Sequence, residues 1–313
     1  MPIPFKEMTV KKKIKLRKLL FLLILISVLR FPAEAAGLQV VTSYPYQREI
    51  VRTIGAERVR VEALARGQWD PHVVVPRPSL IAMVRRAELL VINGAQLEIG
   101  WMPPLLQQAN NPRVMPGRKG FLDFSELVEL IQKPDSVSRA QGDIHPAGNP
   151  HFYLDPTVIP KLAAALSEKL CELDPAGQTE YQNNLQVFND TWQKNLERWS
   201  ELMAPLAGRK VIQYHRNMDY FLLNYSIDTL ATIEPLPGIP PTTRQVMALI
   251  DMLENEGVFC IIHDVYHSEK SSRFLSERSG IPLVILPHDV EALAEADTLT
   301  ALFDTLVNRL VRK

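Results

Sequence analysis

The sequence lacks the short motifs that identify several classes of enzyme. It contains no His-Glu-x-x-His pattern of a zinc protease, no Gly-x-Ser-x-Gly turn of a serine hydrolase and no glycine-rich loop for a phosphate group. It also has no basic tract of the kind that binds nucleic acids. These absences argue against a hydrolase of known type and against a nucleic-acid-binding protein.

Cysteine is scarce, because Cys171 and Cys260 are the only two in 313 residues. Both lie in apolar stretches, so we expect two buried thiols rather than a disulfide, although an oxidising compartment would permit the bond. No cysteine lies near residue 36, which argues against a lipid anchor at that position.

Long apolar runs are also missing from the sequence. The best candidate, residues 19–29, is much shorter than the roughly 20 residues that a membrane-spanning helix needs. It follows a basic segment and precedes Ala33-Glu34-Ala35, which resembles a small-x-small cleavage site. We therefore expect residues 1–36 to be a cleavable signal peptide of a periplasmic protein, with a short amino-terminal anchor as the alternative. Its removal leaves 27 basic and 33 acidic side chains, a mildly acidic chain.

What the remaining chain does contain is an alternation of strand-like and helical patterns, which is typical of an α/β fold with parallel sheets. The strands are expected at residues 38–42, 58–63, 88–93, 113–115, 211–214, 228–232, 258–262 and 283–286. The helices are expected at residues 45–56, 78–86, 125–131, 156–173, 217–225, 243–255, 268–279 and 298–311. The sequence thus predicts two lobes, each with a roughly four-stranded parallel sheet and flanking helices.

One long α-helix is expected to join the two lobes. It starts near Asp174-Pro175, and its apolar side chains recur at helical spacing as far as Met203. About 30 residues in a helix extend roughly 45 Å, which is long enough to cross between lobes. We therefore expect an N-terminal lobe at residues 37–173, a linking helix at 174–205 and a C-terminal lobe at 206–313.

Histidines follow several of the predicted strands or precede a helix. They are His72, His151 and His215, and the pair His288-Asp289 takes the corresponding place near the carboxyl end of the chain. Ligands of open parallel sheets bind beyond the carboxyl ends of strands, so these positions are expected to converge between the lobes. Three imidazoles and one carboxylate would suit zinc, whereas calcium or magnesium would need mostly oxygen donors.

Several short stretches, in the same order, resemble a known family. They are Asp70-Pro71-His72 with Pro76-Arg77-Pro78-Ser79, Asn93-Gly94-Ala95-Gln96-Leu97-Glu98 with Trp101, Asn149-Pro150-His151-Phe152-Tyr153-Leu154-Asp155-Pro156, Tyr214-His215 with Tyr220-Phe221, and Glu234-Pro235-Leu236-Pro237-Gly238-Ile239-Pro240-Pro241. The chain resembles the solute-binding proteins of ABC transporters that import zinc or manganese, in which a single long helix joins two lobes. The resemblance covers nearly all of residues 37–313.

The resemblance implies that both lobes bind the metal and that His72, His151 and His215 are the first three ligands. Asp289 is the expected fourth ligand, with His288 as the alternative, since Pro287-His288-Asp289 departs from the family pattern. Histidine at position 215 favours Zn²⁺ over Mn²⁺, because manganese relatives tend to have a carboxylate there. A histidine-rich loop, which some zinc members carry, is absent: residues 132–150 contain only His145.

The implied function is a periplasmic zinc receptor, not an enzyme, that delivers its metal to a membrane ABC permease. This function also allows a periplasmic metallochaperone as a further partner. The same type of receptor for manganese, a zinc-dependent hydrolase with an open metal position and a receptor for an organic chelate are the alternatives.

Two other groups of polar residues have simpler interpretations. His263 and His267 are expected in a polar turn rather than as a metal pair on one helix. Glu234 and Asp264 are either solvated loop acids or groups that support the metal ligands.

Overall fold

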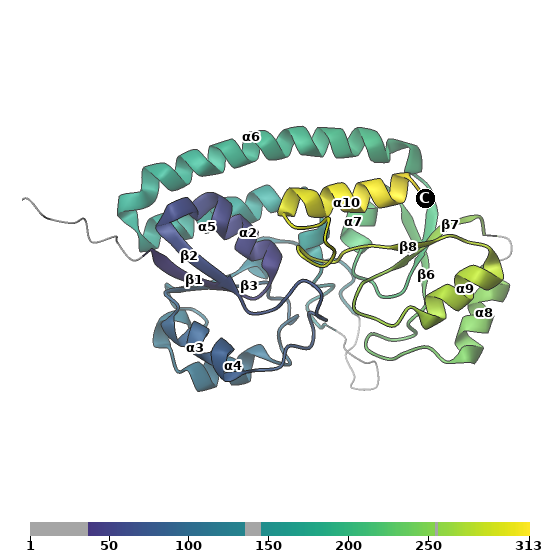
Figure 1. Ribbon diagram of the computed structural model, residues 1–313, viewed down its shortest axis with the longest axis horizontal. Coiled ribbons are helices and arrows are strands. Elements are labelled where there is room, and N and C mark those ends of the chain that lie inside the picture. The colour runs from purple at the N-terminus through teal and green to yellow at the C-terminus, as the bar shows by residue number, and fades with distance from the viewer. Residues whose placement is uncertain (1–36, 135–144, 254–255) are drawn as a thin grey trace, which may run out of the picture. The chain divides into compact units, whose positions relative to one another are not determined.

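The computed structural model describes residues 37–134, 145–253 and 256–313. Its framework is two four-stranded sheets in which every pair of neighbouring strands is parallel (Figure 1). Helices flank each sheet, and one long helix runs past both. The predicted fold class is therefore confirmed: an α/β architecture of two lobes, each built on a four-stranded parallel sheet and joined by one long α-helix.

The N-terminal lobe is the first sheet with helices α2 to α5. Its strands are β1 (Leu38–Thr42), β2 (Val59–Ala63), β3 (Leu89–Ile92) and β4 (Phe121–Asp123), in the spatial order β2-β1-β3-β4. Its helices are α2 (Pro45–Gly55), α3 (Pro78–Arg86), α4 (Met102–Ala109) and α5 (Ile159–Leu173). Strand β3 lies inside the sheet, and its first three residues are fully buried, as its apolar run predicts.

The C-terminal lobe is the second sheet with helices α7 to α10. Its strands are β5 (Lys210–Gln213), β6 (Asp228–Thr232), β7 (Val258–His263) and β8 (Leu283–Ile285), in the spatial order β6-β5-β7-β8. Its helices are α7 (Asp219–Asn224), α8 (Thr243–Leu253), α9 (Lys270–Ser279) and α10 (Leu299–Val311). The strand order repeats that of the first lobe, a likeness that the sequence does not reveal as an internal repeat.

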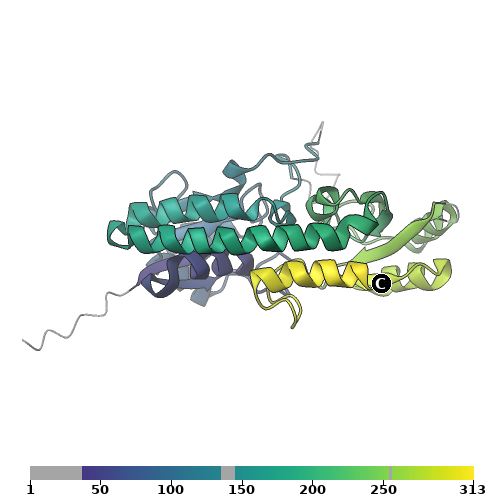
Figure 2. The same ribbon diagram turned by 90° about the horizontal axis from the view of Figure 1, so that it is seen from above.

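The long helix α6 (Gln178–Met203) links the two lobes (Figure 2). It contacts α2 and α5 of the N-terminal lobe and α10 of the C-terminal lobe. The Trp192 indole N–H donates to the Pro156 carbonyl oxygen over 2.8 Å, and the Trp199 indole N–H donates to Asp304 Oδ1 over 2.7 Å. Both tryptophans are buried and pack against Phe303, Trp192 edge to face and Trp199 with tilted rings, so one apolar core continues along α6 from one lobe to the other.

A second, smaller core lies in the C-terminal lobe. It packs side chains of β5 and β7 against helices α8 and α9, with Ile212, Ile261 and Leu275 fully buried. The C-terminal sheet is thus covered on both faces, as parallel sheets usually are.

Segments of the two lobes also contact each other near their strand ends. Arg48 pairs with Glu291 over 2.7 Å, and the Tyr46 backbone N–H donates to Asp289 Oδ1 over 2.9 Å. A Cβ at Gly67 would lie 1.9 Å from the Val290 carbonyl oxygen, so only glycine permits this close approach.

The segment between β3 and α5 corrects the sequence prediction. Residues 113–115 are not a strand, because η2 (Pro112–Val114) is a 3₁₀ turn whose start is fixed by the Asn111 side chain accepting the Arg113 N–H. The fourth strand is β4 instead. The helix expected at residues 125–131 is only η3 (Phe124–Leu127), which begins where Asp123 Oδ1 accepts the Ser125 N–H.

The start of α5 is also later than predicted. Asp155 does accept a backbone hydrogen bond, from Thr157 over 2.8 Å, but this closes a turn and the α-helix begins at Ile159. The turn follows η5 (Phe152–Leu154), a single 3₁₀ turn.

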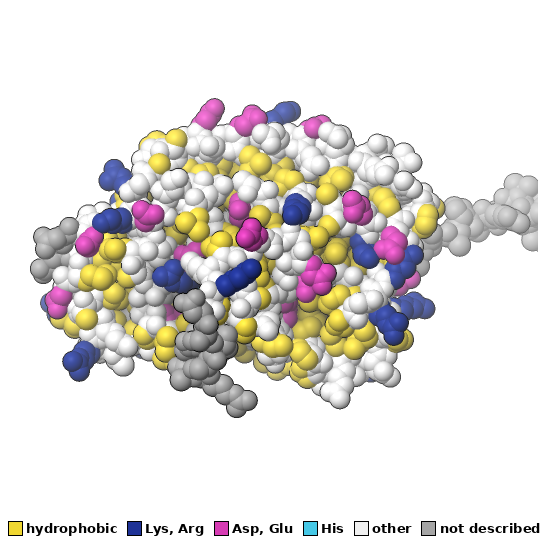
Figure 3. All heavy atoms as spheres, turned by 180° about the vertical axis from the view of Figure 1, so that it is seen from behind, with side chains coloured by type: hydrophobic (Ala, Val, Ile, Leu, Met, Phe, Trp, Pro, Cys, Tyr) yellow, Lys and Arg dark blue, Asp and Glu magenta, His cyan; other side chains and the backbone are white. Residues whose placement is uncertain are grey.

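Both cysteines are free thiols, as predicted, but Cys171 is only partly buried whereas Cys260 is fully buried. Acidic and basic side chains are scattered among apolar ones over the face shown in Figure 3. Within residues 37–134, 145–253 and 256–313, no helix is long and apolar enough to cross a membrane. The expected signal peptide, residues 1–36, lies outside the described residues.

Candidate metal centre

His72 lies in a turn after β2 and is oriented by Asp70. One oxygen, Asp70 Oδ1, lies 2.9 Å from both the His72 backbone nitrogen and His72 Nδ1. A carboxylate acceptor at Nδ1 places the ring proton there and leaves the lone pair of Nε2 for a metal. His72 Nε2 is buried and has no hydrogen-bond partner among the described residues. The pKa of Asp70 is lowered overall, because its hydrogen bonds with His72 outweigh the opposing effect of its burial.

His151 is held through its backbone rather than its ring. Asn149 Oδ1 accepts the His151 N–H over 2.9 Å, and the Asn149 carbonyl oxygen accepts from the Tyr220 hydroxyl over 2.8 Å. The side chain is buried, and in the described part of the chain neither of its ring nitrogens has a hydrogen-bond partner. Burial, followed by the nearby His72 and His215, holds the pKa of His151 well below its usual value. The imidazole is therefore neutral, the form that binds metals.

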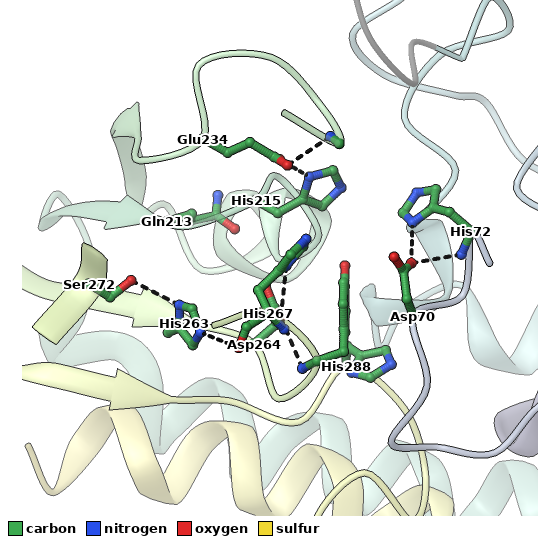
Figure 4. A network of polar contacts seen from close by, with 12 residues as sticks. Asp70, His72, Gln213, His215, Glu234, His263, Asp264, His267, Ser272 and His288 are labelled. Atoms are coloured by element: carbon green, nitrogen blue, oxygen red, sulfur yellow. Dashed lines mark hydrogen bonds and ion pairs between the residues drawn. The ribbon is translucent and has the colours of Figure 1, made fainter. Parts of the chain in front are cut away.

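His215 comes two residues after the end of β5 and is oriented by Glu234 (Figure 4). Glu234 Oε2 lies 2.6 Å from His215 Nδ1, and Glu234 Oε1 accepts the Gly238 N–H over 2.7 Å. Gly238 has a φ of 77°, a conformation that favours glycine. Glu234 is thus buried and not a solvated loop acid, and it orients His215, a predicted metal ligand.

The three histidines from both lobes meet at one point. One ring nitrogen from each of His72, His151 and His215 lies within 4.8 Å of the others, and the ring centroids are 5.3–5.5 Å apart. No other group of three or more His, Cys, Asp or Glu side chains in the described ranges has this geometry. Three converging imidazoles suit a borderline-soft ion such as zinc.

Asp289, the expected fourth ligand, lies outside this cluster. Its Oδ1 accepts the backbone N–H groups of Tyr46 over 2.9 Å and of Val290 over 2.6 Å. Burial raises the pKa of Asp289 well above its usual value. The alternative, His288, places Nε2 3.1 Å from the Trp69 carbonyl oxygen, and burial lowers its pKa to about 4.

A fourth imidazole next to the cluster is that of His145, to which the sequence assigns no role. Its ring stacks on that of His72 with centroids 5.3 Å apart. Burial, with His72 and His215 as further causes, lowers the pKa of His145 to about 3, so its ring is also neutral. His145, His151 and His215 line a pocket of about 400 Å³. The only signal in the sequence is its position six residues before His151 in a turn rich in Gly and Pro.

His263 lies at the end of β7 and His267 in the turn that follows, so the two do not lie on one face of a helix, as the sequence predicts. His263 ends β7 and bonds through Nδ1 to the Ser272 hydroxyl over 2.9 Å. His267 Nδ1 lies 2.9 Å from Asp264 Oδ2. Burial opposes the charge of Asp264, but its bonds to His267 lower the Asp264 pKa to about 2.

Proteins of similar sequence and fold are known. A family model described as "Zinc-uptake complex component A periplasmic" matches residues 40–313. The high-affinity zinc uptake system protein ZnuA of Yersinia pestis is 24% identical over 247 residues, which are 74% of this chain and 76% of that protein. The manganese ABC transporter substrate-binding lipoprotein PsaA of Streptococcus pneumoniae is 22% identical over 251 residues, or 79% of this chain and 78% of that protein.

The fold is likewise similar to a solved one. A crystal structure of ZnuA matches with a TM-score of 0.73 and 22% identity, over 88% of this chain and 98% of that chain. This likeness concerns the arrangement of the two sheets and the long helix.

Proposed function

The chain belongs to the family of periplasmic zinc-uptake complex components A, and from this premise we propose that it is a receptor that binds one zinc ion and delivers it to a membrane ABC permease. The observation that carries the proposal is the convergence of one ring nitrogen from each of His72, His151 and His215 within 4.8 Å. Two of these ligands belong to the N-terminal lobe and one to the C-terminal lobe. A metal at this point would hold the two lobes together.

Zinc fits this group of atoms better than manganese does. Imidazole nitrogens suit zinc, whereas manganese prefers carboxylates and other oxygen donors. The two carboxylates nearest to the ring nitrogens, those of Asp70 and Glu234, contact Nδ1 atoms and so support the ligands from outside. Their negative charges offset the charge of a bound dication. Manganese remains the alternative cargo, since PsaA is a manganese-transporter protein.

The same contacts favour a receptor over a zinc hydrolase. Metal-assisted hydrolysis needs an open metal position and a general base that can reach the attacking water. Asp70 Oδ1 is engaged by two groups of His72, and both oxygens of Glu234 are engaged by His215 and Gly238. We therefore propose that the site holds its metal and performs no reaction on a substrate.

The fourth ligand and the location of the protein extend the proposal. From the sequence, Asp289 is the candidate for the fourth position, and it would have to bind metal while its Oδ1 accepts two backbone N–H groups. A periplasmic location after cleavage of residues 1–36, and exchange with a periplasmic metallochaperone, complete the proposed role.

Metal analysis of the purified chain 37–313 tests this function. We expect one zinc per chain, retained in the presence of excess manganese. The His215→Ala variant is expected to lose its zinc in the same preparation, and His151→Ala is expected to lose it after chelator treatment. Far-ultraviolet circular dichroism verifies that the variants are folded. Stoichiometric zinc in both folded variants, or preferential retention of manganese by the wild type, would contradict the proposal.

A further inference from the structure

The side chain next to the three-histidine cluster that the proposed function leaves unused is His145. Its ring lies against that of His72, with an interplanar angle of 28° and a centroid separation of 5.3 Å. It also shares a pocket with His151 and His215. His145 is therefore adjacent to ligands from both lobes.

One nitrogen of the His145 ring is available to a metal. Burial lowers the pKa of the ring to about 3, and the backbone of Gln96 opposes this shift only in part. The nitrogen Nε2 is buried and has no hydrogen-bond partner among residues 37–134, 145–253 and 256–313. A buried imidazole nitrogen with no partner costs free energy unless something binds it, and His72 Nε2 is in the same situation on the adjoining ring.

The backbone fixes the position of His145 relative to the cluster. The Gly148 N–H donates to the His145 carbonyl oxygen over 3.0 Å, and the Asn149 N–H donates to the Ile131 carbonyl oxygen over 2.9 Å. Gly148 has a φ of 119°, and a Cβ there would lie 2.6 Å from the Ile131 carbonyl oxygen. Only glycine fits this turn, and the turn connects His145 to the segment that carries His151.

Asp289, by comparison, is constrained by other contacts. Its Oδ1 already accepts two backbone N–H groups. Neither Asp289 nor His145 belongs to the three-histidine cluster, but His145 lines the pocket next to it and Asp289 does not. These contacts give Asp289 a structural task at the junction of the lobes, where it caps the Tyr46 backbone.

We propose that His145 takes the fourth position in place of Asp289, so that the metal is bound by four imidazoles. This inference rests on the proposed function and deepens it. Four nitrogen donors complete a tetrahedral zinc site and disfavour manganese further. The charge of the dication is then balanced by Asp70 and Glu234 through the Nδ1 atoms of His72 and His215.

X-ray absorption spectroscopy of the zinc-loaded chain 37–313, combined with chelator competition, tests this ligand set. We expect four imidazoles per zinc in the wild type and three in His145→Ala and His145→Gln. We expect each variant to bind zinc more weakly by at least the ~10–100-fold that loss of a supporting group costs. Asp289→Asn is expected to keep four imidazoles and no less than a tenth of the wild-type affinity. Pro146→Ala, an exposed change in the same turn, is the matched control and should resemble the wild type.

The inference is overturned if His145→Ala and His145→Gln keep the wild-type imidazole number and affinity. It is also overturned if Asp289→Asn removes an oxygen donor from the zinc. Either result would leave a zinc receptor with a different fourth ligand. Failure of the wild type itself to bind zinc would instead contradict the proposed function, so the two failures are distinguishable.

Discussion

The two lobes share one strand order but bring their histidines to the three-histidine cluster in different ways. In the C-terminal lobe, His215 and Glu234 each come two residues after the end of a strand, β5 and β6 respectively. In the N-terminal lobe, His72 lies nine residues beyond β2, and His151 lies 28 residues beyond β4. A strand end therefore places the proposed ligand directly in the C-terminal lobe, whereas side-chain hydrogen bonds within irregular segments place the two proposed ligands of the N-terminal lobe.

The carboxylates that orient the histidines differ in the same way. Glu234 has a side chain that is 3% exposed, and its two oxygens have separate partners. Asp70 has a side chain that is 35% exposed, and a single oxygen accepts both contacts from His72. The orientation of the histidine is thus more tightly constrained in the C-terminal half of the site than in the N-terminal half. Loss of the carboxylate should therefore lower zinc affinity more in the C-terminal half.

The largest effect is expected for Glu234→Gln. Because both Glu234 oxygens face donors, one from His215 Nδ1 and one from the Gly238 N–H, the amide of glutamine must point its N–H₂ group at one of them. We expect zinc affinity to fall by about 100-fold, the upper end of the range for groups that support metal ligands. Competition with a chromophoric zinc chelator measures it.

The matched variant Asp70→Asn is expected to cost about tenfold, the lower end of that range. Asparagine can present its one oxygen to both contacts of His72 and loses only the charge. If Asp70→Asn weakens zinc binding as much as Glu234→Gln does, the difference between the two halves does not determine affinity.

Acid should act in opposite directions through two histidines of the metal-free protein, one in each half. The pKa of His151 lies well below its ordinary value of 6.5, chiefly through burial, so the unfolded chain binds a proton that the folded chain does not. This lowers the free energy of unfolding as the pH falls below about 6.5, by up to ~1.4 kcal/mol per pH unit. In the C-terminal half, burial opposes the charge of His267, but Asp264 raises its pKa overall. His267 therefore stabilises the fold at acid pH, and that contribution is lost as the pH rises through the raised pKa.

Urea unfolding of metal-free variants between pH 8 and pH 5 measures both effects. His151→Ala should lose less stability on acidification than the wild type, and His267→Ala should lose more. Equal pH dependence of the two variants would show that their imidazoles do not titrate as their surroundings indicate.

The same contrast explains how much of the molecule the sequence predicts. The apolar strands and the periodic helices give the two parallel sheets and α6, because burial on both faces leaves a continuous apolar run and one buried stripe gives a helical period. The sequence also predicts that His215 faces the site, because it comes directly after a strand. Strand β4 could not be predicted in this way, because it has only three residues and lies between two turns, one started by the Asn111 side chain before it and one by the Asp123 side chain after it.

Other features of the site depend on contacts between distant residues. The pairing of Glu234 with His215 and the stacking of His145 on His72 join positions 19 and 73 residues apart. No local pattern encodes such distances, so the sequence can name Glu234 as a candidate but cannot place it on an imidazole. The engagement of Asp289 by Tyr46, 243 residues away, is of the same kind.

The smallest effect is expected at Tyr220, whose hydroxyl joins the segment that carries His151 to the C-terminal lobe. The Tyr220 hydroxyl donates to the Asn149 carbonyl oxygen over 2.8 Å and accepts the Ile131 N–H over 3.1 Å, and Asn149 in turn accepts the His151 N–H. Tyr220→Phe removes both bonds of the hydroxyl but leaves the ring in place. We expect a loss of about 1 kcal/mol in the free energy of unfolding. Zinc affinity should fall only a few-fold, because His151 keeps its own backbone bond.

Tyr225→Phe is the control for this change. The Tyr225 hydroxyl is also buried but has no hydrogen-bond partner in the part of the chain that the structure describes. Its removal should therefore leave zinc affinity unchanged and leave the free energy of unfolding unchanged or slightly higher. Urea unfolding and chelator competition on both variants give the comparison. If Tyr220→Phe matches Tyr225→Phe, the segment of His151 is held by its own turn alone, and the irregular N-terminal half of the centre is more independent of the C-terminal lobe than the contacts indicate.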